Sequence, residues 1–434
     1  MLRSEITRSI GQLKQALGED ELFILGRQSG FEKRARSITT LRFVTSLVQS
    51  LGTRRVESIA DLLRDFNRDH DTEVYYKPYY NRLDCPGFPE LMRQVFEAMM
   101  SGLCAQVLKP AKDGPFRRFK DIVVHDGTSF ALHDSLVESF PGRFTKVSPA
   151  AVELHTTMSL FHDNFTCVTA AADSECERAF LPSPSELCDK LFLADRGFDS
   201  TPFMQEIERE NGHFIIRLRA CLDPRVDKIH RAGSRYRALE GQRLNAVIKK
   251  LPKGKQHDID VTCKNGWRAR LVLTWAGPDH GWARLITNLD RIDFDVAEIL
   301  QAYRLRWQIE LYYKELKSYA NLHAFCTRKQ HIAEGLIWAA LCAAFLKRYM
   351  AHVCQRTSRE AISTRRVSMC SHSFLREFFQ CLRRGFRGLR GLLERTVRFL
   401  CVNALRSNLN RERGRGRLAL GLDLAGSARR SALA

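Results

Sequence analysis

Residues 303–317 read Tyr303-Arg-Leu-Arg306-Trp-Gln-Ile-Glu310-Leu-Tyr-Tyr-Lys-Glu-Leu-Lys317. Their polar positions follow the pattern Y-x2-R-x3-E-x6-K, with steps of three, four and seven residues. On an α-helix these steps return to one face, so a tyrosine, an arginine, a carboxylate and a lysine point the same way. Such a face suits a metal ion at its centre with phosphates on either side. The ordinary alternative is a solvated, charged helix face. We expect one long helix from Phe294 to Tyr319.

Two further carboxylates follow short apolar runs, Asp126 after residues 121–125 and Asp195 after residues 190–194. We expect both runs to be buried strands that end in the carboxylate, although aspartates also end strands simply as turn residues. Asp126, Asp195 and Glu310 come from separate elements, and converging acids repel one another unless cations occupy the space between them. Mg²⁺ suits such a site because it prefers oxygen ligands, and two ions support in-line phosphoryl transfer.

Strand-like and helix-like segments alternate in the middle of the chain, which predicts a mixed α/β sheet. A segment rich in turns and strands interrupts this alternation before the Glu310 helix. The apolar run 335–346 is too short to span a bilayer and predicts a buried helix. We expect a helical, DNA-binding N-terminal region (1–115), an α/β catalytic domain (116–335) with a β-rich insertion (about 221–289), a C-terminal helical region (336–410) and a disordered basic tail (411–434).

The charge of the chain favours a polyanionic partner. Lys and Arg number 69 against 49 acids, a net charge of +20, and residues 376–434 hold 14 arginines. Nucleic acid is the first candidate, and tyrosines interleaved with Lys77 and Arg82 in residues 75–82 suit either nucleic-acid contact or ordinary helix packing. A membrane surface is the second, but no basic amphipathic helix supports it. Because the first residues lack an apolar signal-peptide core, we expect a cytoplasmic protein.

Three segments together resemble the DDE transposases of the bacterial insertion-sequence-4 type. Asp126-Gly-Thr-Ser129 is similar to the first-aspartate strand of that family, and Ala194-Asp195-Arg-Gly-Phe198 is similar to its second. Residues 303–317 fill its Y-(2)-R-(3)-E-(6)-K pattern without a gap. The resemblance covers about residues 116–331.

This resemblance implies a ribonuclease H-like core with a β-rich insertion before the glutamate helix. It implies that Asp126, Asp195 and Glu310 ligate two Mg²⁺ ions, for which Mn²⁺ can substitute. Water would attack at the transposon end and free a 3′-OH. In well-studied members that hydroxyl forms a hairpin, which is reopened before the end is joined to target DNA.

The resemblance also implies DNA contacts. Tyr303 and Arg306 would clamp the displaced strand, and Lys317 would hold the phosphate near the cut. Trp282 stands where related enzymes stack a flipped base. Its alternative is a core tryptophan of the insertion.

We therefore expect a cut-and-paste transposase that acts on double-stranded DNA, namely its own terminal inverted repeats and a target, as a homodimer that holds two ends. The expected setting is the bacterial cytoplasm, associated with the nucleoid, with no membrane partner. Two rivals remain open. One is a stand-alone metal-dependent endonuclease with the same core, and the other is a catalytically silent DNA-binding derivative.

Overall fold

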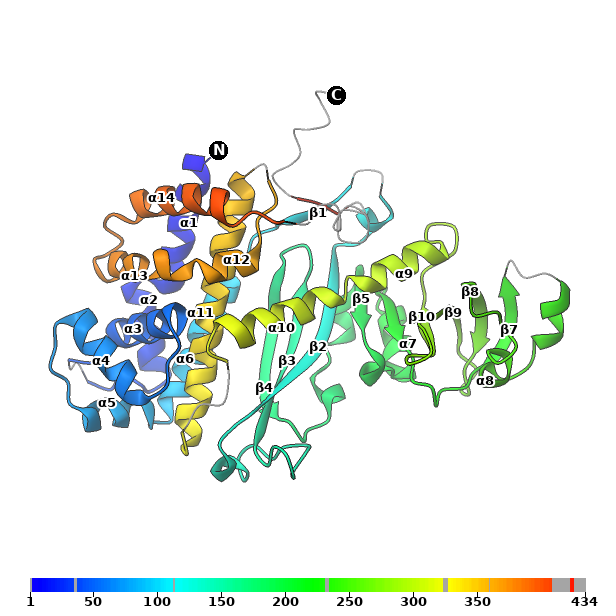
Figure 1. Cartoon of the computed structure of the whole chain (residues 1–434), viewed down its shortest axis with the longest axis horizontal. Helices are drawn as coiled ribbons and strands as arrows, with labels where there is room; N and C mark the ends of the chain where they lie inside the picture. Colours follow the sequence, from blue (N-terminus) through cyan, green and yellow to red (C-terminus); the bar gives the residue numbers. More distant parts are fainter. Residues whose placement is uncertain are drawn as a thin grey trace.

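A helical region and a large β-sheet lie side by side, and helices α9 (Val296–Arg304) and α10 (Trp307–Tyr319) run across the sheet toward the helical region (Figure 1). This computed structural model has the expected mixed α/β character, with helices before and after the strands. The structure describes residues 2–34, 37–111, 114–230, 234–322, 327–358, 360–407 and 422–424.

The N-terminal region is helical, as the sequence predicts. Ser58 begins α4 with a capping box, in which the Ser58 and Asp61 side chains each accept a hydrogen bond from the other residue's backbone N–H. The same helix ends at Asp71, which takes the left-handed conformation. The helices of this region are α1 (Leu2–Leu17), α2 (Glu19–Gln28), α3 (Thr40–Thr53), α4 (Ile59–His70), α5 (Tyr76–Leu83) and α6 (Gly87–Gly102).

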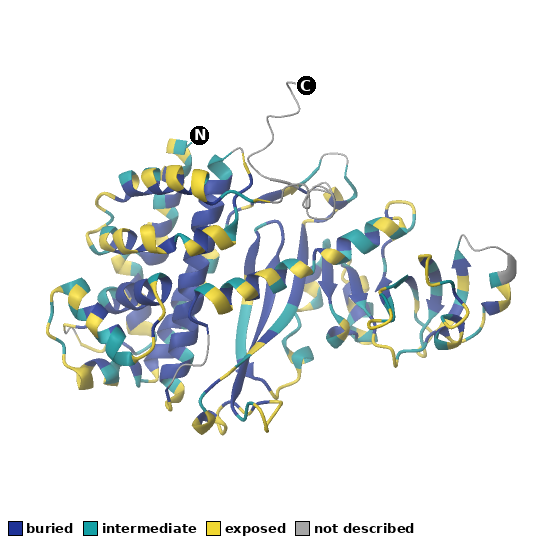
Figure 2. Cartoon of the chain, viewed as in Figure 1, coloured by how far each residue is buried: buried dark blue, intermediate teal, exposed yellow. Residues whose placement is uncertain are grey.

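Helix α11 (Gln330–Thr357) is the buried centre of the helical region, where Figure 2 shows it dark along most of its length. It is long and apolar enough to cross a membrane by composition, but its apolar window is wholly buried inside the protein against helices that include α3 and α6. The apolar run 335–346 is thus a buried helix segment, as predicted. The expected domain boundary between residues 335 and 336 is wrong, because it falls inside this continuous helix.

The helices after α11 do not form a separate region. Helix α13 packs against α3, and α14 packs against α1 and α11, so both ends of the chain contribute to one helical assembly. Burial of their apolar faces requires these distant partners. The C-terminal helices are α12 (Thr364–Met369), α13 (Leu375–Arg383) and α14 (Leu389–Asn403).

Part of the predicted basic tail is a strand. Residues Leu422–Leu424 form β11, which pairs antiparallel with β1 (Leu108–Pro110). The other residues of the predicted tail, 411–421 and 425–434, lie outside the described residues.

Nine strands form one sheet in the described part of the chain, in the order β4-β3-β2-β5-β6-β10-β9-β8-β7. Strand β2 (Asp121–Ala131) pairs antiparallel with β3 (Ala151–Ser159), which pairs antiparallel with β4 (Asn164–Ala172). On its other side β2 pairs parallel with β5 (Lys190–Ala194), and β5 pairs parallel with β6 (His213–Arg217). Three antiparallel strands followed by two parallel ones form the expected ribonuclease H-like core.

The predicted β-rich insertion continues this sheet. Strand β10 (Trp282–Thr287) pairs with β6, and β9 (Arg268–Trp275), β8 (His257–Thr262) and β7 (Arg225–His230) follow outward. These four strands agree with the predicted segment rich in turns and strands. A bulge between Val226 and Lys228 breaks the two-residue alternation that identifies a strand.

The remaining elements are short. Helix α7 (Thr201–Arg209) lies between β5 and β6 along the chain. The others are α8 (Leu244–Val247) and 3₁₀ turns at Pro115–Arg118, Asp134–Leu136, Glu177–Phe180, Pro184–Leu187, Arg196–Phe198, Ser234–Leu239 and Ser371–Ser373.

Both faces of the sheet are buried, and alternation along β2 decides which residues face α10. Val124 belongs to the large core that contains Ile309 of α10 and continues into the helical region. Val123 belongs to the second core, on the opposite face. Because side chains alternate along a strand, Asp126 shares the face of Val124 and points toward α10.

Candidate active site

Asp126 lies in the middle of β2, not at its end as the sequence led us to expect. Strand β2 pairs with β5 only as far as Val124, opposite Leu193, but continues to pair with β3 as far as Ala131. Beyond Val124 the strand has a ladder partner on one side only. Asp126 is therefore fixed by β3 and faces α10, with its side chain 20% exposed.

Asp195 follows the last residue of β5, as predicted. The register places it at the level of Asp126, because each residue lies two positions beyond the last pair of the parallel ladder. Adjacent strands are about 4.8 Å apart, so the parallel ladder alone brings these two carboxylates close. Arg217, the last residue of β6, places its Nη1 3.9 Å from Asp195 Oδ1.

Glu310 lies in the first turn of α10, but the expected single helix from Phe294 to Tyr319 is two helices. Helix α9 ends at Arg304, and i→i+3 hydrogen bonds tighten the chain through Leu305 and Arg306 before α10 begins. The argument from one continuous helix face is therefore wrong in detail. The predicted residues still lie close to the aspartates. The tightened turn between α9 and α10 leaves the Tyr303 and Arg306 side chains directed toward the sheet.

Arg306 joins two of the three carboxylates. Its Nη1 donates to Asp126 Oδ2 at 3.0 Å, and its Nη2 donates to Glu310 Oε1 at 2.5 Å. The fork of the guanidinium suits such simultaneous contacts. The Arg306 side chain is only 13% exposed, so this charge is placed inside the site rather than on the solvated surface.

Tyr303 and Lys317 also reach the strands that carry the acids. The Tyr303 hydroxyl donates to Asp195 Oδ1 at 3.1 Å, and burial followed by the charge of Asp195 raises the pKa of Tyr303. Lys317 Nζ donates to the carbonyl oxygen of Ser129 at 2.9 Å, and burial lowers its pKa. Tyr303, Arg306 and Lys317 thus contact the predicted aspartates or the strand that carries Asp126, and Glu310 is linked to Asp126 through Arg306.

Two residues of the site were missed in the sequence. Arg217 ends an apolar strand and pairs with Asp195. Tyr313 is 6% exposed and donates its hydroxyl to the backbone carbonyl oxygen of Asp126 at 2.8 Å. A signal for Tyr313 was present, because it lies three residues after Glu310 and hence on the same helix face. Arg217 had no such signal, since only the strand order places β6 beside β5.

The negative charges of the three acids affect the pKa of Asp126. The pKa of Asp126 is raised to about 6, mainly by burial; the Arg306 charge and the Gly127 N–H lower it, and the charges of Glu310 and Asp195 contribute to the increase. The negative charges are therefore close enough to interact, as the sequence argument requires.

The three carboxylates are of the ligand type that divalent cations such as Mg²⁺ prefer. The three carboxylates offer oxygen ligands, and they are 20%, 26% and 32% exposed at Asp126, Glu310 and Asp195. As the side chains stand, the described residues contain no group of three His, Cys, Asp or Glu that could hold a metal ion. The Arg306 guanidinium lies between Asp126 and Glu310, in the space that a cation bound to both carboxylates would take.

Glu153 lies against the opposite face of the same strand. It is 4% exposed, and burial raises its pKa to about 7. A Cβ atom on Gly127 would meet Glu153 Oε1 at 2.2 Å, so the residue after Asp126 has to be glycine unless Glu153 moves. His125 is buried on this face against Phe198.

Trp282 does not join the carboxylates. It begins β10 and packs with Trp275 and His257, at ring-centroid distances of 5.5 and 5.7 Å. It contacts the second core, as does Ile286 four residues on, so it lies on the face of the sheet opposite to Asp126. These contacts favour the alternative that Trp282 packs within the insertion.

Comparison with known proteins places this geometry in a family. Residues 117–346 match the family model described as "Transposase DDE domain". The chain is 26% identical over 258 residues to a putative transposase of insertion sequence element IS186A from Escherichia coli (strain K12), and as similar to the transposase of IS421 from Escherichia coli. It is 20% identical over 442 residues to the transposase of IS231D from Bacillus thuringiensis subsp. finitimus, covering 88% of this chain and 89% of that one.

The matched lengths differ among these relatives. The alignments to the two Escherichia coli proteins cover 51% of this chain and 65% of theirs, so the chain spans less than two thirds of their length. Among solved structures, the piggyBac transposase in its synaptic complex with hairpin DNA aligns with a TM-score of 0.47 and 12% identity, covering 92% of this chain and 85% of that chain.

Proposed function

Because the chain belongs to the transposase DDE domain family, we propose that it is a cut-and-paste transposase that cuts DNA at the ends of an insertion sequence and joins the freed 3′ ends to a target. One observation carries the proposal. A single guanidinium, that of Arg306, lies between Asp126 and Glu310, while Tyr303 holds Asp195. Three carboxylates from three separate elements thus lie close together, two of them paired with one guanidinium, and a pure binding protein has no need of that arrangement.

Asp126, Asp195 and Glu310 are the proposed catalytic and metal-binding residues, and they would hold two Mg²⁺ ions, or Mn²⁺ in their place. Bound there, such ions activate the attacking oxygen and stabilise the leaving oxygen of an in-line displacement. The raised pKa of Asp126 supports this assignment, because burial, its main cause, and the neighbouring acids both disfavour the negative charge, and added positive charge would offset both effects.

The neighbouring residues position the DNA. With cations at Asp126 and Glu310, the Arg306 guanidinium would be free to bind a backbone phosphate, for which its fork is suited. Tyr303 gains the same freedom when Asp195 no longer accepts its hydroxyl. Lys317, two turns beyond Glu310 on α10, carries a charge that the Ser129 carbonyl does not neutralise. These three side chains are the proposed clamp on the strand that is cut.

We assign recognition of the element's ends to the N-terminal helices. Tyr75 and Tyr76 are 78% and 49% exposed at the start of α5, beside Lys77, and exposed aromatics next to a cation suit stacking on bases. Tyr79 of the same segment is buried, so the packing alternative holds for that residue. Two ends must be held together before joining, and we therefore propose a homodimer on DNA.

The test is cleavage and joining of a labelled duplex that carries the ends of the protein's own locus, with Mg²⁺ present. The parent protein should cut at the element boundary and join the product to a plasmid. Glu310→Gln should bind the duplex but not cut it. Glu377→Gln, on an exposed ion pair of α13, is the matched control and should act as the parent does.

Other outcomes separate the rivals. Cutting without joining would favour a stand-alone endonuclease. Binding without metal-dependent cutting in the parent would contradict the proposal and favour a DNA-binding derivative. Light scattering with and without the duplex measures the expected dimer.

A further inference from the structure

A cavity of about 590 Å³ lies where the α3–α4 connection, the end of α10, the middle of α11 and the segment after α12 meet. Its described lining contains four cationic side chains and a histidine but no Asp or Glu. It is separate from the carboxylate site, yet Lys317 of the catalytic helix lines it. The charged and titratable lining residues are Arg54, Arg55, Lys317, Lys347 and His372.

Lys347 is the most unusual of these residues. It is 2% exposed, and its Nζ donates to the carbonyl oxygen of Tyr319 at 2.5 Å. Burial lowers its pKa to about 8, so it still carries its charge at neutral pH. A carbonyl dipole only partly offsets the cost of burying an ammonium group. An anion in the cavity would complete that compensation.

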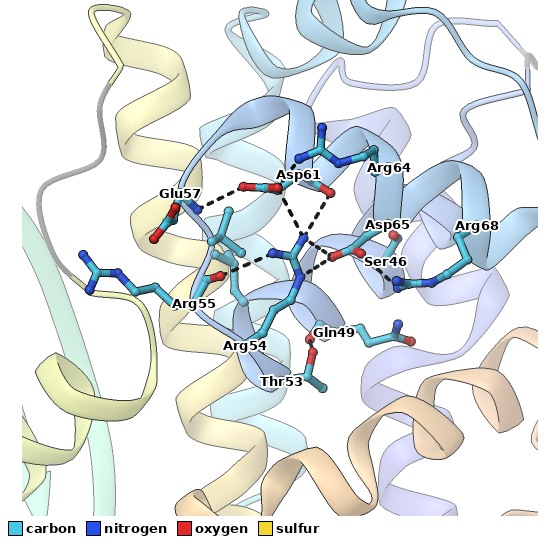
Figure 3. Close-up of polar contacts among 12 residues, drawn as sticks. Ser46, Gln49, Thr53, Arg54, Arg55, Glu57, Asp61, Arg64, Asp65 and Arg68 are labelled. Atoms are coloured by element: carbon cyan, nitrogen blue, oxygen red, sulfur yellow. Dashed lines mark hydrogen bonds and ion pairs between the residues drawn. The ribbon is translucent and has the colours of Figure 1, made fainter.

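The two arginines of the connection play different parts (Figure 3). Arg54 donates to Asp65 Oδ2 through Nε at 3.1 Å and through Nη2 at 2.9 Å. Its charge is therefore paired with an acid of the N-terminal helices. The Arg55 side chain extends away from these acids and is exposed. Arg55 therefore offers its charge to the cavity.

The walls of the cavity are fixed by hydrogen bonds between distant segments. Asn321, which follows α10 in the left-handed conformation, donates to the carbonyl oxygens of Leu51 and Arg54 at 2.6 and 2.7 Å. Its Oδ1 accepts from the Val56 N–H at 3.0 Å. One buried amide thus ties the end of the catalytic helix to the α3–α4 connection, so the cavity is built before any ligand arrives.

We propose that this cavity binds a backbone phosphate of double-stranded DNA and so couples the N-terminal helices to the catalytic helix. The inference rests on the proposed function for its choice of DNA. Lys317 lies seven residues from Glu310, about 10 Å along the helix axis. At about 3.4 Å of rise per nucleotide, this spacing corresponds to about three nucleotides along one strand. The DNA segment that enters the carboxylate site therefore reaches the cavity as well.

The test uses exposed residues at the cavity, so that folding is preserved. Met369 lines it and is 52% exposed. Met369→Glu adds a negative charge, and Met369→Gln is its neutral match. Arg55→Gln removes a cation, and Arg209→Gln removes an exposed arginine of α7, outside the lining residues. Binding of a labelled mixed-sequence duplex is measured by anisotropy without divalent ions, over a series of NaCl concentrations.

Met369→Glu and Arg55→Gln should weaken binding about ten-fold at low salt, because each opposes or removes one charge-assisted phosphate contact. The slope of log Kd against log salt should fall by about one for Arg55→Gln. Met369→Gln and Arg209→Gln should match the parent. Inorganic phosphate should compete no better than NaCl of equal ionic strength. Stronger competition would identify a free-anion site and overturn the assignment to DNA.

Equal affinities and slopes for Arg55→Gln, Met369→Glu and the two controls would overturn the proposal, even when the parent cuts DNA. A parent that does not cut but shows the expected changes would sink the proposed function and leave the cavity assignment intact. Failure of the parent to bind any duplex would overturn both.

Discussion

The hydroxyl of Tyr313 donates a 2.8 Å hydrogen bond to the backbone carbonyl oxygen of Asp126. This bond ties the helix that carries Glu310 to the strand that carries the first aspartate. The same hydroxyl lies within hydrogen-bonding distance of Thr156 Oγ1 on β3. Tyr313 therefore sets the separation of two acids without touching either carboxylate.

Tyr313→Phe should lower the rate of DNA cleavage at saturating DNA and leave DNA affinity unchanged, since the carboxylates remain but their spacing relaxes. Stability should fall by about 1 kcal/mol, the usual net value of one hydrogen bond. Tyr312→Phe is the matched control, because its hydroxyl bonds to Asn164 of β4. It should lose similar stability and keep the cleavage rate. Equal rates for the two variants would refute a positioning role for Tyr313.

Asp126→Asn should abolish cleavage but stabilise the protein in chelator at pH 8. The folded pKa of Asp126, about 6, lies above its ordinary value of 3.8. Protonation of Asp126 thus stabilises the folded state, and this contribution to the free energy of unfolding is lost as pH rises from about 4 to 6. The shift corresponds to about 2–3 kcal/mol. The free energies of unfolding of the two proteins, measured with urea, should diverge above pH 5. A difference that stays constant with pH would contradict the raised pKa of Asp126.

Mg²⁺ provides a second measurement on the same variant. A ligand that binds only the folded state raises the melting temperature. Mg²⁺ should therefore raise Tm for the parent and have a much smaller effect on Asp126→Asn and Glu310→Gln. Equal shifts in all three proteins would place the ion elsewhere.

Arg306→Gln should move the pH dependence of Mg²⁺ binding upward. The Arg306 charge lowers the pKa of Asp126, so its removal raises that pKa, and protons then compete with the ion up to a higher pH. The midpoint of the Mg²⁺-induced Tm shift against pH should rise. Arg304→Gln, two residues away and exposed, is the control and should leave the midpoint unchanged.

Arg348→Met should destabilise the protein by about 3–5 kcal/mol, since it removes the arginine that two buried acids share. Arg348 is 5% exposed and pairs with Glu315 of α10 at 3.0 Å and with Asp163, in the β3–β4 turn, at 2.9 Å. Arg93→Met removes a partly exposed pair with Glu90 and should cost less than about 1 kcal/mol. Urea unfolding measures the stability of both variants. Equal losses of stability would show that the ion pairs of Arg348 with Asp163 and Glu315 contribute little.

Local patterns predicted much of the fold and of the candidate site. The apolar runs 121–125 and 190–194 indicated β2 and β5, and the spacing in residues 303–317 identified four residues that lie near the aspartates. The prediction failed where partners distant in sequence decide the outcome. Pairing with β3 carries β2 beyond Asp126, and a tightened turn divides the expected helix at Leu305. The side of the sheet on which Trp282 packs follows from its contacts with Trp275 and His257.

The sequence by itself determined which residues are available for chemistry, because residue types and short spacings are local properties of the chain. Asp126, Asp195, Glu310 and the basic residues near them could be identified in this way. Only the tertiary structure decided that Arg306 lies between two acids, that Arg217 and Tyr313 complete the site, and that Lys347 and Arg55 share a cavity. Those relations join segments tens to hundreds of residues apart, and long-range packing sets them after local structure has formed.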